Sequence, residues 1–373
     1  MTCGIKKSEP ADGTILAMKI KKWHLWLGVA VSVVFLYLAF RKVDFGQVWQ
    51  YFKAAQWGWA VLGLGFYFVG VWLRAVRWQV LLNPIKQLSV ARLFPVVAIG
   101  YMGNNVYPAR AGEVLRSVLL KQKDNIDISA SLATIVVERL FDAIVILGFV
   151  LLNIGQLGKL NAAQGMMSGI QRGAVIGGVV FGLILLVFLA MVLLPAQTQR
   201  LFGWFIDHLL PAKIRPALKN IVGRFIDGLS SLKSPLESLK VLILTMLIWT
   251  FETGLYWGVM KALGIDLSFI SLMLINGVVN LVLLIPAAPG GLGTFDAACK
   301  AMLELFGVGT NLALGFTLLL RVALWVPITL LGAVFFVKEG FSLSTDIQTI
   351  QASYQAQEGE TKPPAHLDDE ERL

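Results

Sequence analysis

The sequence predicts an all-α, polytopic membrane protein, and three observations support this fold class. The composition is strongly apolar: 57% of the 373 residues are hydrophobic and only 15% are charged, with a mean hydropathy of +0.72. Several apolar segments reach the roughly 20 residues that a helix needs to cross a bilayer. Two further apolar regions are interrupted by Pro and Gly, at residues 104–116 and 289–296. Inside a membrane, such breaks occur where the chain is buried in protein or lines a water-filled space.

Six segments are predicted to be full spans, and they cover residues 24–40, 57–82, 128–153, 173–194, 237–260 and 311–337. Two more regions, 91–122 and 268–306, each hold a short apolar run, a broken motif and a polar return. Each is predicted to be a re-entrant hairpin, because so short a run cannot comfortably cross the bilayer and come back. One alternative stays open, since residues 268–286 are long enough to cross fully.

The rest of the chain predicts segments at the membrane surface or in water. Residues 1–22 are polar and Lys-rich, which indicates a cytoplasmic N-terminal segment, with Met18 as an alternative start. Residues 23–340 are predicted to form a single transporter-like transmembrane domain. Within it, residues 196–235 place apolar and basic side chains on different helical faces, as an interfacial amphipathic connector does. The polar tail at 341–373 is predicted to be a disordered cytoplasmic segment.

The two broken motifs share a pattern. The first runs from Asn104 to Arg116 and the second from Pro289 to Asp296, and both contain Pro-x-x-x-Gly followed by an acid. Proline removes an amide donor and glycine adds backbone entropy, so each motif is expected to break its helix. The residues expected to shape the backbone there are Asn105, Pro108, Gly112, Pro289, Gly290, Gly291 and Gly293.

The order of these elements predicts an inverted repeat. A trio of span, hairpin and span is followed by a second such trio, at 57–82, 91–122 and 128–153, then at 237–260, 268–306 and 311–337. The first trio enters the membrane from outside and the second from inside, so their topologies are opposed. Paired broken segments in corresponding halves are the best sequence indicator of a transporter's binding site at the membrane midplane.

The distribution of basic residues predicts the orientation in the cytoplasmic (inner) membrane. Lys and Arg cluster in the loops assigned to the inside, which makes both termini cytoplasmic. Arg74 and Arg77, at the end of the span 57–82, are expected near the cytoplasmic surface. This asymmetry also accounts for the net charge of +9, so no nucleic-acid partner is expected.

Charged residues inside the predicted membrane region form the candidate site. A charge at membrane depth costs at least about 2.5–3.5 kcal/mol, so such residues are usually paired or face water. Arginine offers a planar fork that suits bidentate phosphate contacts, and it stays charged when desolvated. The acids would pair with the arginines or bind coupling protons or cations. The candidate substrate-binding residues are Arg110, Glu113, Arg116, Glu138, Arg139, Asp142, Glu252, Asp296 and Arg321.

A second interpretation of the same charges is purely structural. Glu138 and Asp142 are four residues apart on one helix face, and Arg139 lies three residues before Asp142. Lys300 and Glu304 form another pair with a spacing of four. Such pairs hold irregular helices together as internal salt bridges. From the sequence alone, both interpretations stay open.

Glycines between residues 165 and 182 form a stripe. Gly165, Gly169, Gly173 and Gly177 recur every fourth residue, and Gly178 and Gly182 continue on an adjoining line of the same helix. Small residues at this spacing let helix backbones approach closely in a membrane. The stripe predicts close helix packing, either within the chain or across an oligomer.

The sequence gives little support to metal or nucleotide chemistry. Cys3 and Cys299 are far apart, and none of the three histidines has a helix-spaced partner. Neither a Walker A sequence nor a GxGxxG motif is present. No metal site and no cofactor are therefore expected.

Three motifs carry a resemblance to a known family. They are Pro108-Ala-Arg-Ala-Gly-Glu-Val-Leu-Arg116, Glu138-Arg139-x-x-Asp142 and Pro289-Gly-Gly-Leu-Gly-Thr-Phe-Asp296. In this order, over roughly residues 20–340, the chain resembles the transmembrane-region family of lysylphosphatidylglycerol synthases, which are flippase-like membrane proteins. That family usually has Glu where this chain has Asp296. Its enzymatic members carry an added soluble domain, and no such domain is recognisable in this sequence. The resemblance therefore implies the stand-alone form, without synthase activity.

The residues and the resemblance together predict translocation of a lipid. The expected substrate is an anionic phospholipid or a lipid-linked phosphate intermediate, flipped across the cytoplasmic membrane by a protein that is not an enzyme. Two alternatives stay open. One is an ion-coupled carrier of a small soluble anion, and the other is an intramembrane lipid-modifying enzyme with Glu113 or Asp296 as general base.

Overall fold

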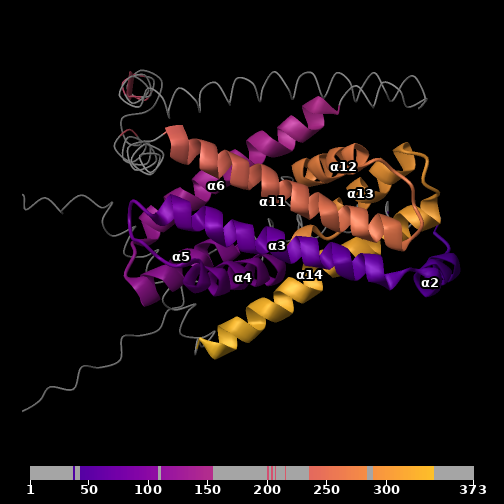
Figure 1. The fold of residues 1–373 in the computed structure, drawn as a ribbon, viewed down its shortest axis with the longest axis horizontal. Helices are drawn as coiled ribbons and strands as arrows, with labels where there is room; N and C mark the ends of the chain where they lie inside the picture. Colours follow the sequence, from indigo (N-terminus) through magenta and orange to yellow (C-terminus); the bar gives the residue numbers. More distant parts are fainter. Residues whose placement is uncertain are drawn as a thin grey trace, which may run out of the picture.

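The computed structural model describes residues 43–107, 111–153, 235–283 and 289–339, with Tyr37 and residues 200, 203, 204, 206 and 215. The predicted spans 24–40 and 173–194, the glycine stripe, nearly all of the connector at 196–235 and both terminal segments lie outside these residues. Every regular element in the described ranges is a helix (Figure 1). The elements are α2 (Phe45–Ala54), α3 (Trp57–Leu82), α4 (Val90–Val106), α5 (Ala111–Asp124), α6 (Ile128–Leu152), α11 (Pro235–Ala262), α12 (Phe269–Val282), η3 (Pro289–Gly291), α13 (Thr294–Leu305) and α14 (Thr310–Lys338).

Three of these helices are long and apolar enough to cross a membrane, namely α3, α11 and α14. They agree with three predicted spans to within two residues at each end. Helix α6 agrees with a fourth predicted span and has 25 residues, which gives a length of about 38 Å against a hydrocarbon core of about 30 Å. It differs from the other three because three charged residues, Glu138, Arg139 and Asp142, lie together near its middle.

The two predicted hairpins are each broken into two short helices, α4 with α5 and α12 with α13. Helix α12 has 14 residues and is therefore about 21 Å long, which is too short to cross a bilayer. Within the described residues the helix ends at Val282, four residues before the end of the alternative span 268–286. Both first arms begin at a serine cap: Ser89 Oγ accepts from the amide of Arg92, and Ser268 Oγ accepts from that of Ser271.

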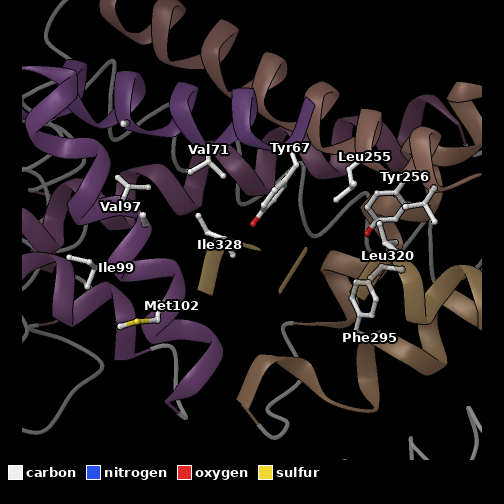
Figure 2. Packing of buried hydrophobic residues seen from close by; sticks show 14 of the residues in the cluster. Tyr67, Val71, Val97, Ile99, Met102, Leu255, Tyr256, Phe295, Leu320 and Ile328 are labelled. Carbon is white, nitrogen blue, oxygen red and sulfur yellow. The ribbon is translucent and has the colours of Figure 1, made fainter. Parts of the chain in front are cut away.

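Helices α3 and α11 pack against each other along their lengths in antiparallel directions. Their backbones come close where two glycines meet, because a Cβ built on Gly258 of α11 would lie only 2.6 Å from Gly63 Cα of α3. Around this pair the main apolar core draws on every α-helix from α3 to α14 in the described ranges. Figure 2 shows part of it, including Tyr67 of α3, Tyr256 of α11 and Phe295 of α13.

The two hairpins open at opposite ends of the helical bundle. At one end, the amide of Gln56 donates to Ala262 O over 2.9 Å, which joins the start of α3 to the end of α11. At the other end, Lys86 Nζ donates to Asp124 O over 2.7 Å, which joins the end of α3 to the end of α5. Hairpin α4–α5 therefore begins and ends at the end of the bundle marked by Lys86 and Asp124. Hairpin α12–α13 begins and ends at the opposite end, marked by Gln56 and Ala262.

Contacts between these eight helices occur in matched pairs. Replacing α3, α4, α5 and α6 by α11, α12, α13 and α14, and the reverse, turns each contacting pair into another contacting pair. For example, α4 contacts α14 and α12 contacts α6, while α3 contacts α6 and α11 contacts α14. Helix α2 lies apart from this pattern and packs on α14, where the amide of Asp44 donates to Asn311 Oδ1 over 3.0 Å.

Candidate functional site

Helix α3 places Arg74 and Arg77 one turn apart in the protein interior, so the expected position near the cytoplasmic surface is wrong. Arg74 Nη2 donates to Glu252 Oε2 of α11 over 2.5 Å. Arg77 Nη1 donates to Asp142 Oδ1 of α6 over 2.6 Å and to Thr245 Oγ1 over 3.0 Å. Acids on the neighbouring helices compensate the arginine charges, which stabilises these side chains inside the protein rather than in the loops.

Helices α5 and α6 extend this arrangement through Glu138. Arg116 Nη1 of α5 donates to Glu138 Oε2 over 2.9 Å, and Arg77 Nε lies 3.9 Å from the other carboxylate oxygen. The Arg116 guanidinium also stacks on Trp78, with its central carbon 3.9 Å from the ring centroid. Glu138 thus bridges an arginine from α3 and one from α5, and its side chain is 1% exposed.

Arg139 of α6 has the longest contacts of the group. It lies 3.5 Å from Glu113 Oε1, 3.5 Å from Asp142 Oδ2 and 3.9 Å from Glu138 Oε2. Its side chain is 37% exposed, whereas that of Arg77 is completely buried. Arg139 is therefore shared among three acids and is held closely by none of them.

We call these eight residues the central charge cluster. It joins four arginines to four acids from α3, α5, α6 and α11, so the formal charges cancel. Aromatic rings enclose it: the Arg74 guanidinium lies over Tyr101 and Trp249, and Trp249 Nε1 donates to Asp142 over 3.0 Å. The members are Arg74, Arg77, Arg116, Arg139, Glu113, Glu138, Asp142 and Glu252.

Although its formal charges cancel, the central charge cluster contains hydrogen-bond donors that have no acceptor among the described residues. Within the described residues, no acceptor meets the buried nitrogens Arg74 Nη1, Arg77 Nε, Arg116 Nε, Arg116 Nη2 and Arg139 Nε. Leaving a buried charged donor unpaired costs on the order of 1–3 kcal/mol or more, so such groups call for a partner such as water or a ligand. These donors can hydrogen-bond to an anion, and phosphate oxygens suit the geometry of a guanidinium.

A second charged pair lies at the other broken motif. Arg321 of α14 binds Asp296 of α13 in a bidentate manner, with both N–O distances at 2.7 Å. Arg321 also donates to the carbonyls of Gly291 and Gly290 over 3.2 and 3.4 Å. Asp296 Oδ2 in turn accepts from the amide of Gly293 over 2.9 Å and so caps α13. The pair fixes the loop before α13 to the adjacent span.

The backbone of that loop depends on glycine. Gly290, Gly291 and Gly293 all have φ between 64° and 83°, a region that side chains other than glycine rarely adopt. A Cβ at Gly290 would also lie 2.1 Å from the Trp325 ring. The predicted role of these residues in shaping the chain thus has a visible physical basis.

The structure describes the first broken motif up to residue 107 and again from residue 111. Asn105 Nδ2, at the end of α4, donates to Thr329 Oγ1 of α14 over 2.9 Å. A Cβ at Gly112, at the start of α5, would lie 1.9 Å from Gly100 O, so the two arms of the hairpin are in backbone contact. Pro108 and Arg110 lie outside the described residues.

The structure thus divides the sequence-predicted residues into two groups. Six of them meet in the central charge cluster, namely Glu113, Arg116, Glu138, Arg139, Asp142 and Glu252. Asp296 and Arg321 form the separate pair. The predicted salt bridges of Arg139 with Asp142, and of Lys300 with Glu304 at 3.6 Å, are both present.

Sequence reasoning missed Arg74 and Arg77 as members of the site. The signal that could have identified them is their spacing of three within an apolar run that continues to Leu82. Basic residues meant for the surface usually follow such a run rather than lie inside it.

Outside the spans, the Lys121 ammonium donates to Asp127 over 2.8 Å and holds the pKa of that carboxyl below its usual value.

Comparisons with known proteins identify the family. The model of the lysylphosphatidylglycerol synthase transmembrane region matches residues 25–332. A UPF0104 membrane protein of Methanothermobacter thermautotrophicus is 29% identical over 70% of this chain and 78% of its own length. Another, from Methanocaldococcus jannaschii, is 26% identical over 62% of this chain and 92% of its own.

A further relative is the glycosyltransferase AglD of Haloferax volcanii. It is 24% identical over 82% of this chain, and the match spans only 53% of that protein. Because the family model covers most of the chain, including all the helices of the central charge cluster, this protein belongs to the lysylphosphatidylglycerol synthase transmembrane-region family.

Proposed function

We propose that this protein moves an anionic phospholipid or a lipid-linked phosphate intermediate between the leaflets of the cytoplasmic membrane, without catalysing a reaction on it. The observation that carries the proposal is the set of five buried guanidinium nitrogens without acceptors in the central charge cluster. Placing four arginines between membrane helices is costly unless they are paired or serve a ligand. A phosphate head group supplies the acceptors that the cluster lacks.

We also propose that the two halves form an inverted repeat, which would support a transport role. The matched contacts of α3–α6 and α11–α14, and the opening of the two hairpins at opposite ends, are what two opposed halves would give. In transporters of this construction, broken helices from both halves meet near the membrane midplane and alternate between two states. The two hairpins would then form the walls of one pathway.

The distribution of charge supports the orientation that we propose. The end of the bundle where α4–α5 opens carries Lys86, Arg92, Lys121, Lys123 and Lys338. The opposite end carries Lys53 and Lys261 in the described residues. Basic residues prefer the cytoplasmic side, so hairpin α4–α5 faces the cytoplasm, hairpin α12–α13 faces outward and both termini are cytoplasmic.

The relative named a glycosyltransferase supports a lipid-linked substrate. The match covers 82% of this chain, and about half of the relative's own length lies outside it. A membrane region that binds a lipid-linked phosphate would be useful next to an enzyme that transfers sugars. In this chain the same region would bind and translocate such a lipid, with the cluster acids balancing charge or carrying coupling protons or cations.

A vesicle assay tests this function. The purified protein is reconstituted with traces of fluorescent phosphatidylglycerol, and dithionite then bleaches only the dye that reaches the outer leaflet. Translocation should carry bleaching well beyond the fraction seen in protein-free vesicles. Arg116→Lys keeps the charge but loses the planar fork, so it should slow this phase, whereas Arg92→Lys at the exposed end of α4 should not.

Two results would argue against the proposal. One is bleaching that stops at the protein-free level although the protein is folded and correctly inserted. The other is rapid release of trapped radiolabelled phosphate with no lipid movement, which would favour the carrier of a small soluble anion.

A further inference from the structure

Two acid–arginine pairs occupy equivalent positions in the two halves. Glu113 is the third residue of α5 and contacts Arg139 of α6, which follows it by 26 positions. Asp296 is the third residue of α13 and contacts Arg321 of α14, which follows it by 25 positions. In each half, an acid in the first turn of the second hairpin arm thus contacts an arginine on the following span. We call each pair an acid–arginine clamp.

The two clamps differ in geometry. The clamp of Asp296 and Arg321 is closed, with two N–O contacts of 2.7 Å. The clamp of Glu113 and Arg139 is open: the nearest N–O distance is 3.5 Å, and neither Arg139 Nε nor Glu113 Oε1 has a hydrogen-bond partner within the described residues. Equivalent parts therefore adopt different states in the two halves of one molecule.

Solvent exposure distinguishes Arg139 from the other arginines of the central charge cluster. Its side chain is 37% exposed, against 8% for Arg74 and 6% for Arg116. Those two also have close carboxylate contacts, at 2.5 and 2.9 Å. Arg139 has the most exposed side chain of these arginines, and its three acid partners all lie at 3.5 Å or more.

We infer that the open clamp is a binding site for a phosphate group, which takes the place of Glu113 on Arg139. This inference rests on the proposed function and assigns its first contact with the substrate. A phosphate accepts two parallel hydrogen bonds from a guanidinium, as Asp296 does from Arg321 in the closed clamp. In the opposite state of the transporter the roles exchange: the clamp of Glu113 and Arg139 closes, and that of Asp296 and Arg321 opens.

This assignment predicts that substitutions of the two clamp residues change the affinity for phosphate in opposite directions. Glu113 competes with the ligand for Arg139, so Glu113→Gln should tighten binding of phosphate several-fold. Arg139→Gln removes the guanidinium and should weaken binding on the order of tenfold or more, the effect of losing hydrogen bonds to a charged group. Arg139→Lys, which keeps the charge without the fork, should fall between the parent and Arg139→Gln.

Calorimetric titration of the purified protein in detergent measures these affinities. The probes are dihexanoyl phosphatidate, which presents a lipid head group, and inorganic phosphate, which presents the same chemistry without acyl chains. Asp127→Asn and Arg92→Gln are matched controls, because each removes one exposed charge whose ion-pair partner is not a clamp residue. Both controls should bind phosphatidate as the parent does, and phosphatidate should bind more tightly than inorganic phosphate.

Misfolding cannot imitate the tighter binding expected of Glu113→Gln, so that variant decides the outcome. The clamp is overturned if Glu113→Gln binds phosphatidate as the parent does, or weakens binding as Arg139→Gln does. Equal binding of inorganic phosphate would support the clamp but assign it to a soluble anion. Absence of lipid movement in vesicles, with the opposite-sign shifts intact, would refute the proposed translocation and leave the binding site standing.

Discussion

Arg74 and Glu252 show what a buried ion pair requires from its surroundings. They lie on α3 and α11, their side chains are 8% and 10% exposed, and their N–O distance is 2.5 Å. Desolvating two charges is costly, and their mutual attraction offsets that cost only while both are present. The free energy of unfolding should therefore respond more strongly to the loss of one partner than to the loss of both.

We predict that Arg74→Met lowers the free energy of unfolding by about 3–5 kcal/mol, because it leaves the Glu252 carboxylate buried and unpaired. Adding Glu252→Leu should restore most of this loss. The measurement is denaturant unfolding in detergent micelles. Arg92→Met is the matched control: its partner Asp124 is 3.5 Å away and Arg92 is 41% exposed, so the change should stay within about 0.5 kcal/mol. Equal effects of Arg74→Met and Arg92→Met would contradict the buried-pair account.

Individual residues were only partly predictable from the sequence. The acids were identifiable because a carboxylate inside an apolar run is expensive wherever it points, and Glu138, Asp142 and Glu252 all prove to be buried. The pairing of Arg77 with Asp142 was not predictable. Helical periodicity says which side chains share a face, but it does not say which neighbouring helix that face meets.

At the scale of elements, the hairpin α4–α5 depends on close backbone contact. Gly100 and Gly103 of α4 lie against Gly112 of α5, where a Cβ would be 1.9 Å from Gly100 O and 2.6 Å from the amide nitrogen of Asn104. Both of these atoms belong to the backbone, so neither can move without moving the helix. The spacing of the two arms is therefore fixed by the absence of one side chain.

Gly112→Ala should force the arms apart and cost about 1–3 kcal/mol or more of unfolding free energy, as overpacking of a tight interface does. Gly148→Ala in α6 is the control, because no other atom lies within 4 Å of its added Cβ. Alanine inside a helix is favoured over glycine by about 0.5–1 kcal/mol, so this control should be neutral or stabilising. Thermal unfolding of the two variants gives the comparison, and a tolerant Gly112→Ala would be inconsistent with backbone contact.

The element boundaries could be predicted well wherever a long apolar run or a helix-breaking motif marks them. Spans and hairpin arms agree because Pro, Gly and Ser act locally on the backbone. Helix α2 lies in a stretch for which no element is predicted, since its ten residues are too few for a clear apolar period. Asp44 caps it, and it presents Phe45 and Trp49 outward, which suits aromatic side chains at a membrane interface.

For the whole molecule, the predicted orientation can be tested at two exposed aspartates. Asp127 lies between α5 and α6 and contacts Lys121, while Asp266 lies between α11 and α12 and contacts Lys261. In a background with both native cysteines replaced by serine, Asp266→Cys should react with an impermeant maleimide added to intact cells. Asp127→Cys should react only after permeabilisation. Labelling of both from one side would contradict the inverted repeat.

The architecture of the whole molecule was predictable to the level of an all-helical membrane protein with long spans and two broken regions, because apolar runs and helix-breaking residues mark these elements in the sequence. The packing was not predictable. The close approach of α3 and α11 at Gly63 and Gly258 depends on surfaces far apart in the sequence. The difference between the clamps of Glu113 and Asp296 belongs to one conformational state, which composition and spacing do not encode.

The central claim is that the two broken hairpins serve one translocation pathway, and a double-mutant cycle on the rate of lipid movement tests it most directly. The variants are Glu113→Gln, Asp296→Asn and their combination, reconstituted in the vesicle assay with fluorescent phosphatidylglycerol. If the two clamps open alternately on the same substrate, their effects should be non-additive, with an interaction energy of about 0.5–3 kcal/mol. Effects that add to within about 0.3–0.5 kcal/mol, as independent sites do, would contradict the shared pathway.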